Sequence, residues 1–235
     1  MPGGHATRPE ADRPRLVVAT RSEHKLRELG ELLHLERGVL LSLDDLGVPG
    51  ESVEDGPTFE ANARIKARFA VEATGLPSLA DDSGIEVDAL GGGPGVRTRR
   101  YAGPSATDAS NNAKLLAALD GLPPDRRGAR YVCVLALALP EPWGPSEPWG
   151  PARSSRTRGP IGRPRLILRR GTCRGRIASS PRGDGGFGYD PIFEPASEPP
   201  GGRTLGLYSR EEKHAISHRA RAARRMAPVL RDLGF

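Results

Sequence analysis

The sequence predicts an α/β protein, and three observations support this class. Short apolar runs such as Leu16–Ala19 and Tyr131–Leu139 are typical of buried strands. Between such runs lie segments with leucine or alanine at helical spacing and with capping residues at their ends. The length of 235 residues is enough for one sizeable core, or for two small lobes that share a cleft.

The composition excludes several classes of protein. No apolar run approaches the roughly 18 residues that a membrane-spanning helix needs, and the first residues lack the apolar stretch of a secretory signal, so we expect a cytoplasmic protein without a membrane partner. Cys133 and Cys173 are too few for a disulfide scaffold. The net charge of +6 is local, because nine arginines and no acid lie between Arg153 and Arg176. Nucleic acid is therefore not the expected partner.

The first elements predict an anion site. Residues 1–14 are polar and rich in Pro and Gly, which predicts a flexible tail before a domain at 15–235. The first strand leads into a helix that we expect to run through Leu35. Thr20 and Glu23 resemble a capping box, so the backbone N–H groups at this helix start face outward, where they suit an anion.

The middle of the chain predicts a helix followed by a strand with acidic residues. Thr58 as N-cap and Gly75 just past the end bound an alanine-rich helix over 59–73. Residues 78–90 alternate imperfectly, as in a strand or hairpin that contains Asp81-Asp82-Ser83-Gly84. A further helix is expected over 108–119.

The last part of the chain predicts two neighbouring strands, 131–139 and 166–170. A low-complexity insertion at about 140–164, in which Glu-Pro-Trp-Gly-Pro occurs twice, joins them as a long surface loop that carries arginines. Ser209 and Glu212 form a capping box for a final helix that we expect to run to about Leu230.

The loop between the first strand and helix is the first candidate cluster. It contains Thr20, Arg21, Ser22, Glu23, His24 and Lys25. Hydroxyls, N–H groups and the Lys25 ammonium would together bind a polyphosphate. The alternative is an ordinary capped helix with a solvated lysine, and the cluster taken alone favours that alternative.

Three carboxylates form the second candidate cluster. One helix separates Glu54 from Asp81 and Asp82, and Mg²⁺ is usually held by one or two carboxylates together with phosphate oxygens and water. Successive strand residues face opposite ways, so Asp81 and Asp82 do not both point at one metal unless the turn rotates one of them. The alternative is a polar turn before a hairpin. Asn62 and Lys66, on one face of the separating helix, are supporting candidates.

Glycines and aromatic residues form the third cluster, over 183–191. The segment satisfies the dinucleotide motif G-x-G-x-x-G, but Pro191 disfavours the helix that this motif must open. Instead, the glycines would let the backbone approach a ligand while Phe187 or Tyr189 lies against a flat ring. The alternative is a glycine-rich turn with core aromatics.

The fourth cluster lies on the final helix. His214 and His218 have the spacing of a zinc pair, but no glutamate follows His214, so zinc is not expected. Ser217, His218 and Arg219 are candidates for hydrogen bonds to a base, and Lys213 for a contact with phosphate. The alternative is a solvated basic helix.

Taken together, these clusters closely resemble the inosine/xanthosine triphosphate pyrophosphatase family, the Ham1-like enzymes that remove deaminated purine nucleotides. The resemblance spans about Arg15 to Leu230 without the insertion. Its main blocks are Thr58-Phe59-Glu60-Ala61-Asn62-Ala63, Leu79-Ala80-Asp81-Asp82-Ser83-Gly84, Arg100-Tyr101-Ala102-Gly103, Gly185-Gly186-Phe187-Gly188-Tyr189-Asp190-Pro191 and Ala215-Ile216-Ser217-His218-Arg219.

The resemblance implies a two-lobed fold with a long mixed sheet flanked by helices, an active-site cleft between the lobes, and a homodimer. Glu54 and Asp82 match the family's magnesium ligands, and Asp82 also matches its proton acceptor. Substrate contacts are implied for Thr20 to Lys25, Ser83, Phe187, Gly188, Tyr189, Asp190, Lys213, His218 and Arg219. The phosphate loop departs from the family at position 22, where Ser replaces the usual Asn, and Glu23 brings a negative charge toward the phosphates.

We therefore expect a Mg²⁺-dependent enzyme that hydrolyses ITP, dITP and XTP to the monophosphate and pyrophosphate. Two alternatives stay open. One is a nucleic-acid-binding protein that uses the Arg153–Arg176 loop, and the other is a related pyrophosphatase for modified pyrimidine nucleotides. The sequence identifies no residue that would exclude GTP.

Overall fold

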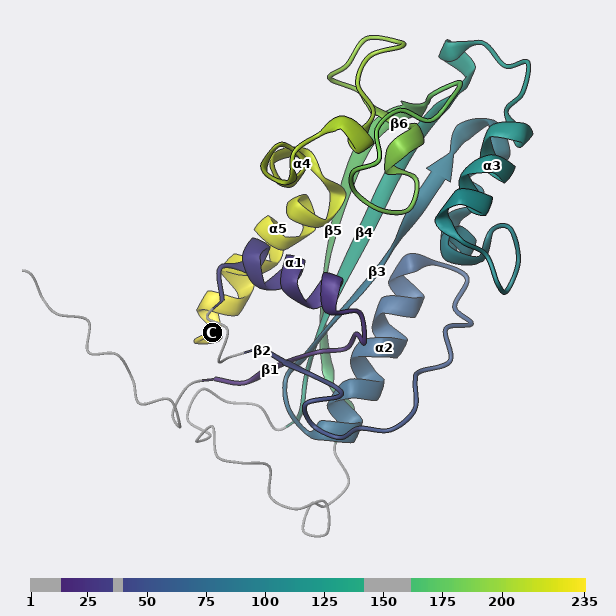
Figure 1. The fold of residues 1–235 in the computed structure, drawn as a ribbon. Coiled ribbons are helices and arrows are strands. Elements are labelled where there is room, and N and C mark those ends of the chain that lie inside the picture. Colours follow the sequence, from purple (N-terminus) through teal and green to yellow (C-terminus); the bar gives the residue numbers. More distant parts are fainter. Residues whose placement is uncertain (1–13, 36–39, 142–161) are drawn as a thin grey trace, which may run out of the picture.

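The strands form one mixed sheet in a computed structural model that describes residues 14–35, 40–141 and 162–235. The six strands lie in the order β2-β1-β3-β4-β5-β6. They are β1 (Leu16–Val18), β2 (Leu40–Ser42), β3 (Ser78–Val87), β4 (Gly128–Leu139), β5 (Arg165–Ile177) and β6 (Phe193–Pro195). β1 is parallel to β2 and β3, and the other pairs are antiparallel. The prediction of an α/β fold with a long mixed sheet is confirmed (Figure 1).

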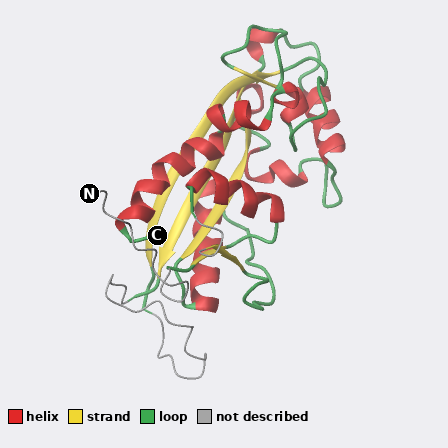
Figure 2. Cartoon of the chain, turned by 60° about the vertical axis from the view of Figure 1, so that its left-hand side comes forward, coloured by secondary structure: helices red, strands yellow, loops and turns green. Residues whose placement is uncertain are grey.

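Helices cover both faces of this sheet (Figure 2). The helices are α1 (Glu23–Leu33), α2 (Phe59–Thr74), α3 (Asp108–Ala118), α4 (Arg210–Ile216) and α5 (His218–Asp232). α1 and α5 pack on one face, where their apolar residues meet Leu79 and Leu135, whereas α2 packs on the other, against Ala80 and Val134. Figure 1 shows α3 at the far end of the long strands, away from β1 and β2.

Consecutive residues of β3 therefore enter different surroundings. Because Leu79 faces α1 and α5 and Ala80 faces α2, the alternation of a strand directs Asp81 toward α1 and α5 and Asp82 toward α2. α5 crosses the sheet very closely at Gly171, where an added Cβ would lie 2.1 Å from the backbone oxygen of His218. This contact fixes the start of α5 over the same face as Asp81.

One edge of β3 is open beside the two aspartates. β1 pairs only with Ser78 and Leu79. The next contact along this edge is the 2.9 Å hydrogen bond from Ile85 N to the Thr98 hydroxyl. No described strand pairs with β3 between Leu79 and Ile85 on this side, so side chains from both faces of the sheet can reach the same edge.

Several predicted helix ends are confirmed because the capping interactions are local. The Thr58 hydroxyl accepts from Ala61 N at the start of α2, and Gly75 ends it with φ at 64°. Ser209 and Glu212 form the expected capping box.

The predicted boundaries of two helices were wrong. The N-cap of α1 is Ser22, whose hydroxyl accepts from Lys25 N, rather than Thr20, and α1 ends at Leu33 rather than Leu35. The single final helix is two helices, because Ser217 has extended backbone with ψ at 155° and caps a new helix, α5. Because of this break, His218 and Arg219 lie in the first turn of α5, where they contact the sheet.

Other predictions fall outside the described residues. They concern the N-terminal tail, except Pro14, and most of the insertion, at 142–161. Within the part of the chain that the structure describes, no helix is both long enough and apolar enough to cross a membrane.

Candidate active site

Asp81 is a fully paired anion beneath α1 and α5. Lys25 Nζ lies 2.5 Å from its Oδ1, and Arg219 Nε donates to its Oδ2 at 3.1 Å. The Cys133 thiol donates to the same Oδ2 at 3.3 Å. Burial alone would raise the pKa of Asp81, but Arg219 and Lys25 hold that pKa well below its usual range. Asp81 therefore stays ionised and holds Lys25 beside β3.

Arg219 links three elements into one buried network. Its side chain is 1% exposed. Besides Asp81, its Nη1 donates to Glu28 Oε2 at 2.6 Å and its Nη2 to the Ser83 hydroxyl at 3.1 Å. The structure thus uses three guanidinium nitrogens of Arg219 to join α1, β3 and α5, although the sequence pointed to base recognition for this residue.

Asp82 lies on the opposite face, and its one cationic partner among the described residues is Lys66 of α2. Lys66 Nζ is 2.7 Å from Asp82 Oδ1 and 3.0 Å from Glu54 Oε2. Burial raises the pKa of Asp82 despite Lys66, since the negative charges of Asp81 and Glu54 act in the same direction as burial. Burial would lower the pKa of Lys66, but Asp82 and Glu54 more than offset it, so the ammonium stays charged.

The loop that carries Glu54 is held against α2 by a side-chain cap. Asn62 Oδ1 accepts from Gly56 N at 2.8 Å, and the approach is so close that a Cβ at Gly56 would lie 2.6 Å from the same oxygen. No group of three or more His, Cys, Asp or Glu side chains placed to hold a metal occurs among the described residues. Glu54 and Asp82, which the sequence predicted to lie at a common edge, bring two carboxylates into contact with the Lys66 ammonium.

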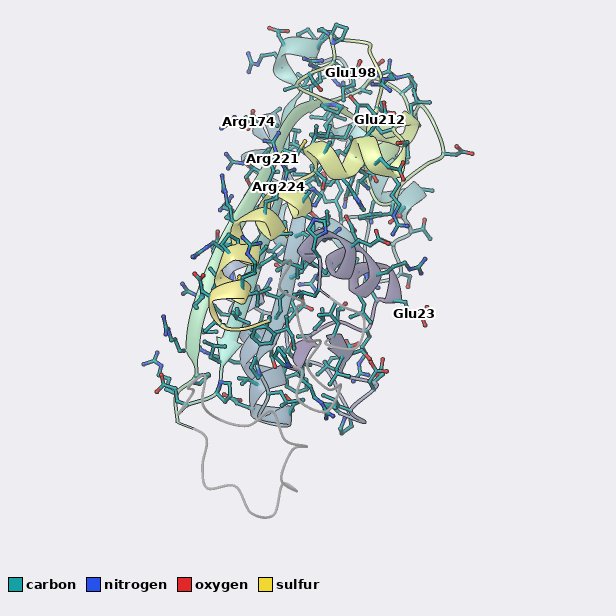
Figure 3. All side chains as sticks on the ribbon, turned by 90° about the vertical axis from the view of Figure 1, so that its left-hand side faces the viewer. Glu23, Arg174, Glu198, Glu212, Arg221 and Arg224 are labelled. Carbon is teal, nitrogen blue, oxygen red and sulfur yellow. The ribbon has the colours of Figure 1, made fainter. Side chains whose placement is uncertain are left out.

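The predicted phosphate loop follows β1 and lies at the level of Asp81, because β1 runs parallel to β3 with Val18 opposite Leu79. The Thr20 hydroxyl accepts from Ser22 N at 3.1 Å, which shapes the turn before α1. Glu23 and His24 form the first turn of α1. Glu23 is exposed, and Figure 3 shows its side chain pointing outward.

Arg21 points away from the phosphate loop and contacts the segment after β2. Its guanidinium pairs with Asp44 and donates to the backbone oxygens of Val48 and Gly50, the latter at 2.6 Å. Arg21 therefore ties the phosphate loop to the segment that leads to Glu54.

Asp190 organises the predicted base loop. Its Oδ2 accepts from Phe187 N at 2.8 Å and lies 2.5 Å from Lys213 Nζ. The Lys213 ammonium also lies 3.9 Å from the centre of the Phe187 ring. Burial raises the pKa of Asp190, although Lys213 opposes the shift. Lys213 is thus placed at the base loop, and Gly188 N donates to Asp108 of α3 at 2.7 Å.

Tyr131 joins the base loop to α5. Its ring stacks on His218, with centroids 4.7 Å apart and planes 8° apart. Its hydroxyl accepts from Tyr189 N at 3.1 Å and lies 3.4 Å from Asp190 Oδ1. Burial, together with Arg219 and Lys213, lowers the pKa of His218 well below its usual value, so His218 is neutral at neutral pH. Its buried Nδ1 has no hydrogen-bond partner among the described residues.

Comparison with known proteins identifies the family of the chain. The sequence profile of the Ham1 family matches residues 16–229, which is most of the chain. The chain belongs to the Ham1 family. A dITP/XTP pyrophosphatase of Syntrophobacter fumaroxidans is 47% identical to it over 207 residues, which are 88% of this chain and 78% of that protein. A dITP/XTP pyrophosphatase of Mycobacterium bovis is 45% identical over 222 residues, 93% of this chain and 96% of that protein.

The fold agrees with solved Ham1 structures. The HAM1 protein from Coxiella burnetii superposes with a TM-score of 0.75 at 37% identity, over 93% of this chain and 99% of that chain. The Ham1 protein of Staphylococcus aureus superposes with a TM-score of 0.74 at 31% identity, over 93% of this chain and 98% of that chain. The predicted resemblance to this family is confirmed.

Three residues of this Ham1-family site were missed in the sequence. Glu28 had a signal, since it lies three residues after Lys25 and beside Leu29 on the buried side of α1. Tyr131 also had one, because it alternates with Cys133 on the strand face that carries Asp81. Asp108 had none, since an acid in the first turn of a helix is an ordinary feature.

Proposed function

We propose that this Ham1-family chain is a Mg²⁺-dependent dITP/XTP pyrophosphatase, which hydrolyses dITP, ITP and XTP to the nucleoside monophosphate and pyrophosphate. The observation that carries the proposal is the convergence of the Glu54 and Asp82 carboxylates on the ammonium of Lys66. Relatives that are 45 to 47% identical bear the name dITP/XTP pyrophosphatase. A cytoplasmic location and a homodimer complete the proposal.

The carboxylate pair fits a magnesium ion. Magnesium is bound through one or two carboxylates plus substrate phosphates and water, and both carboxylates here already direct an oxygen at one positive charge. Glu54 and Asp82 would hold the ion, which neutralises phosphate charge and polarises the phosphoryl oxygens.

The residues of the chain would position the triphosphate and the water. The Ser22 hydroxyl and the N–H groups at the start of α1 face the phosphates, and Lys25, whose side chain is 31% exposed, supplies a charge to the departing pyrophosphate. Asp82 would accept a proton from the water that attacks the α-phosphorus.

The base would lie against Phe187, whose backbone is fixed by Asp190. Neutral His218 carries a single N–H, which can donate to the 6-oxo group that hypoxanthine and xanthine share. Adenine presents an amino group at this position, so a donor would meet a donor and ATP would bind poorly. None of these contacts discriminates against GTP.

A substrate panel tests the proposal. The purified chain is assayed for pyrophosphate and monophosphate release from dITP, ITP, XTP, GTP, ATP and dUTP, with Mg²⁺ and with EDTA. The proposal predicts turnover of dITP, ITP and XTP with Mg²⁺ but not with EDTA, and little turnover of ATP or dUTP. Preference for a pyrimidine nucleotide would favour the related pyrophosphatase, and salt-sensitive binding of nucleic acid without turnover would favour the nucleic-acid-binding alternative.

A further inference from the structure

The Lys66 ammonium occupies the point at which the two proposed metal ligands converge. Its Nζ lies 2.7 Å from Asp82 Oδ1 and 3.0 Å from Glu54 Oε2. Within the described part of the chain, Lys66 is the only basic residue that pairs with either carboxylate. Its side chain is 11% exposed, as is that of Asp82, so the contact is largely shielded from water.

A divalent cation and this ammonium cannot both use Asp82 Oδ1 and Glu54 Oε2. Mg²⁺ requires its oxygen ligands at about 2.0 to 2.1 Å, closer than either oxygen lies to Nζ. An ion drawn in to that distance would lie next to a second positive charge in a weakly hydrated site, where repulsion is strong. Binding of the ion therefore requires Lys66 to move away.

We propose that Lys66 competes with the divalent cation for Glu54 and Asp82, and that the metal binds tightly only together with a polyphosphate that accepts the Lys66 ammonium. This inference rests on the proposed function for the identity of the two metal ligands. Lys66 is suited to the exchange because its ammonium is a compact charge on a flexible four-carbon stem. Phosphate oxygens beside the metal offer it new acceptors, so the exchange leaves neither charge unpaired.

The contrast with Lys25 shows why the exchange is specific to Lys66. Asp81 is paired with Arg219 as well as Lys25, so Lys25 can turn toward phosphate while Asp81 keeps a buried partner. Asp82 has no such second partner among the described residues, and it needs either Lys66 or a metal ion. Metal and nucleotide are thereby coupled, and coupling of this kind is reciprocal: each strengthens the binding of the other.

Direct binding of Mn²⁺ to the full chain, followed by electron paramagnetic resonance, measures this competition without turnover. The variants are Lys66→Met and, as a matched control, Lys25→Met, which removes the same charge on the opposite face of the sheet. Without nucleotide, Lys66→Met is expected to bind Mn²⁺ about tenfold more tightly than wild type, and Lys25→Met within about twofold of it.

Adding the non-hydrolysable inosine 5′-(α,β-methylene)triphosphate completes the experiment. This nucleotide is expected to tighten Mn²⁺ binding to the wild type about tenfold and to Lys66→Met less than about threefold, because the variant has no ammonium to displace. The double variant Lys66→Met/Glu54→Gln should lose the gain, which ties it to this carboxylate pair. Circular dichroism confirms that each variant is folded.

Two results would overturn the inference and leave the proposed function intact. One is an unchanged Mn²⁺ affinity in Lys66→Met, and the other is an equal gain in both lysine variants, which would reveal a general effect of net charge. A different result, no Mn²⁺ binding to any variant with or without nucleotide, would reject the metal site and with it the proposed function.

Discussion

Asp81 and Asp82 are neighbours in the chain but differ in almost every physical respect. Asp81, on the face under α1 and α5, is bound by Lys25 and Arg219, which hold its pKa well below the usual range. Asp82, on the face under α2, has one ammonium partner at 2.7 Å and a pKa raised by burial. The same residue type is thus paired with two cations on one face and, among the described residues, with one on the other.

The difference arises from how many positive charges each face supplies. The face of Asp81 is organised by Arg219, which is buried and connects α1, β3 and α5. The face of Asp82 is organised by one lysine and by a loop whose Glu54 side chain is 43% exposed. A fully compensated buried charge is rigid, whereas a partly compensated one near solvent can exchange partners. Substitutions that alter one face and leave the other intact can therefore test this difference.

The largest expected effect is on stability, from Arg219→Met. Removing the guanidinium leaves the buried carboxylates of Asp81 and Glu28 without their shared partner, which typically costs about 3 to 5 kcal/mol. Urea denaturation should show this loss in the free energy of unfolding. Arg221→Met, on the exposed side of the same helix, is the control and should change it by less than about 0.5 kcal/mol. Equal effects in both variants would mean that the buried network contributes no special stability.

A smaller effect concerns pH and His218. The pKa of His218 in the folded protein lies well below its pKa in the unfolded chain. At a pH between these two pKa values the unfolded chain binds more protons than the folded protein. The free energy of unfolding therefore falls as pH drops below about 6.5. Between pH 7.5 and pH 5 the contribution is up to about 2 kcal/mol. His218→Gln should have a flatter stability curve than wild type over this range. Parallel curves for the two proteins would show that burial of neutral His218 is not the cause.

Next in size is the effect of Tyr131 on nucleotide binding. Tyr131→Leu removes both the stack on His218 and the hydroxyl that accepts from Tyr189 N, so the KM for ITP should rise about tenfold with a smaller change in kcat. Tyr131→Phe keeps the stack and should show about a threefold rise. If Tyr131→Leu lowered kcat and left KM unchanged, Tyr131 would have no part in positioning the base.

The smallest predicted effect concerns Glu23, at the start of α1. This exposed carboxylate lies beside the proposed phosphate site, so Glu23→Gln should lower the KM for ITP about twofold at low salt and have less effect at high salt. Glu72→Gln, which removes an equal charge from the exposed surface of α2, should have no effect. A rise in KM would show that Glu23 assists binding instead of opposing it.

Local features of the fold could be predicted from the sequence, and features formed at long range could not. The ends of α2 were predicted because Thr58 and Gly75 act within one helical turn. The pairing of Arg219 with Glu28 was not, since 191 residues separate them and both belong to elements whose relative placement only the sheet determines. That Asp81 and Asp82 face opposite sides of the sheet was predictable from strand alternation, but which of them faces α2 and Lys66 was not.

The break between α4 and α5 shows a second limit. Helical spacing continues through Ser217, and a serine inside a helix is common, so periodicity gave no sign that it caps a new helix. The same applies to β2, whose three residues Leu40–Ser42 form a strand only because β1 pairs with them. In both cases tertiary contacts decide the local conformation.

The most direct test of the account compares Asp82→Asn with Asp81→Asn in the same two measurements, the kcat for ITP with Mg²⁺ and the free energy of unfolding. Asp82→Asn should lower kcat about 10³-fold and leave the protein folded. Asp81→Asn should instead lower the free energy of unfolding by about 3 kcal/mol, because Arg219 and Lys25 lose the buried counter-charge that they share. A near wild-type kcat in Asp82→Asn would contradict the account.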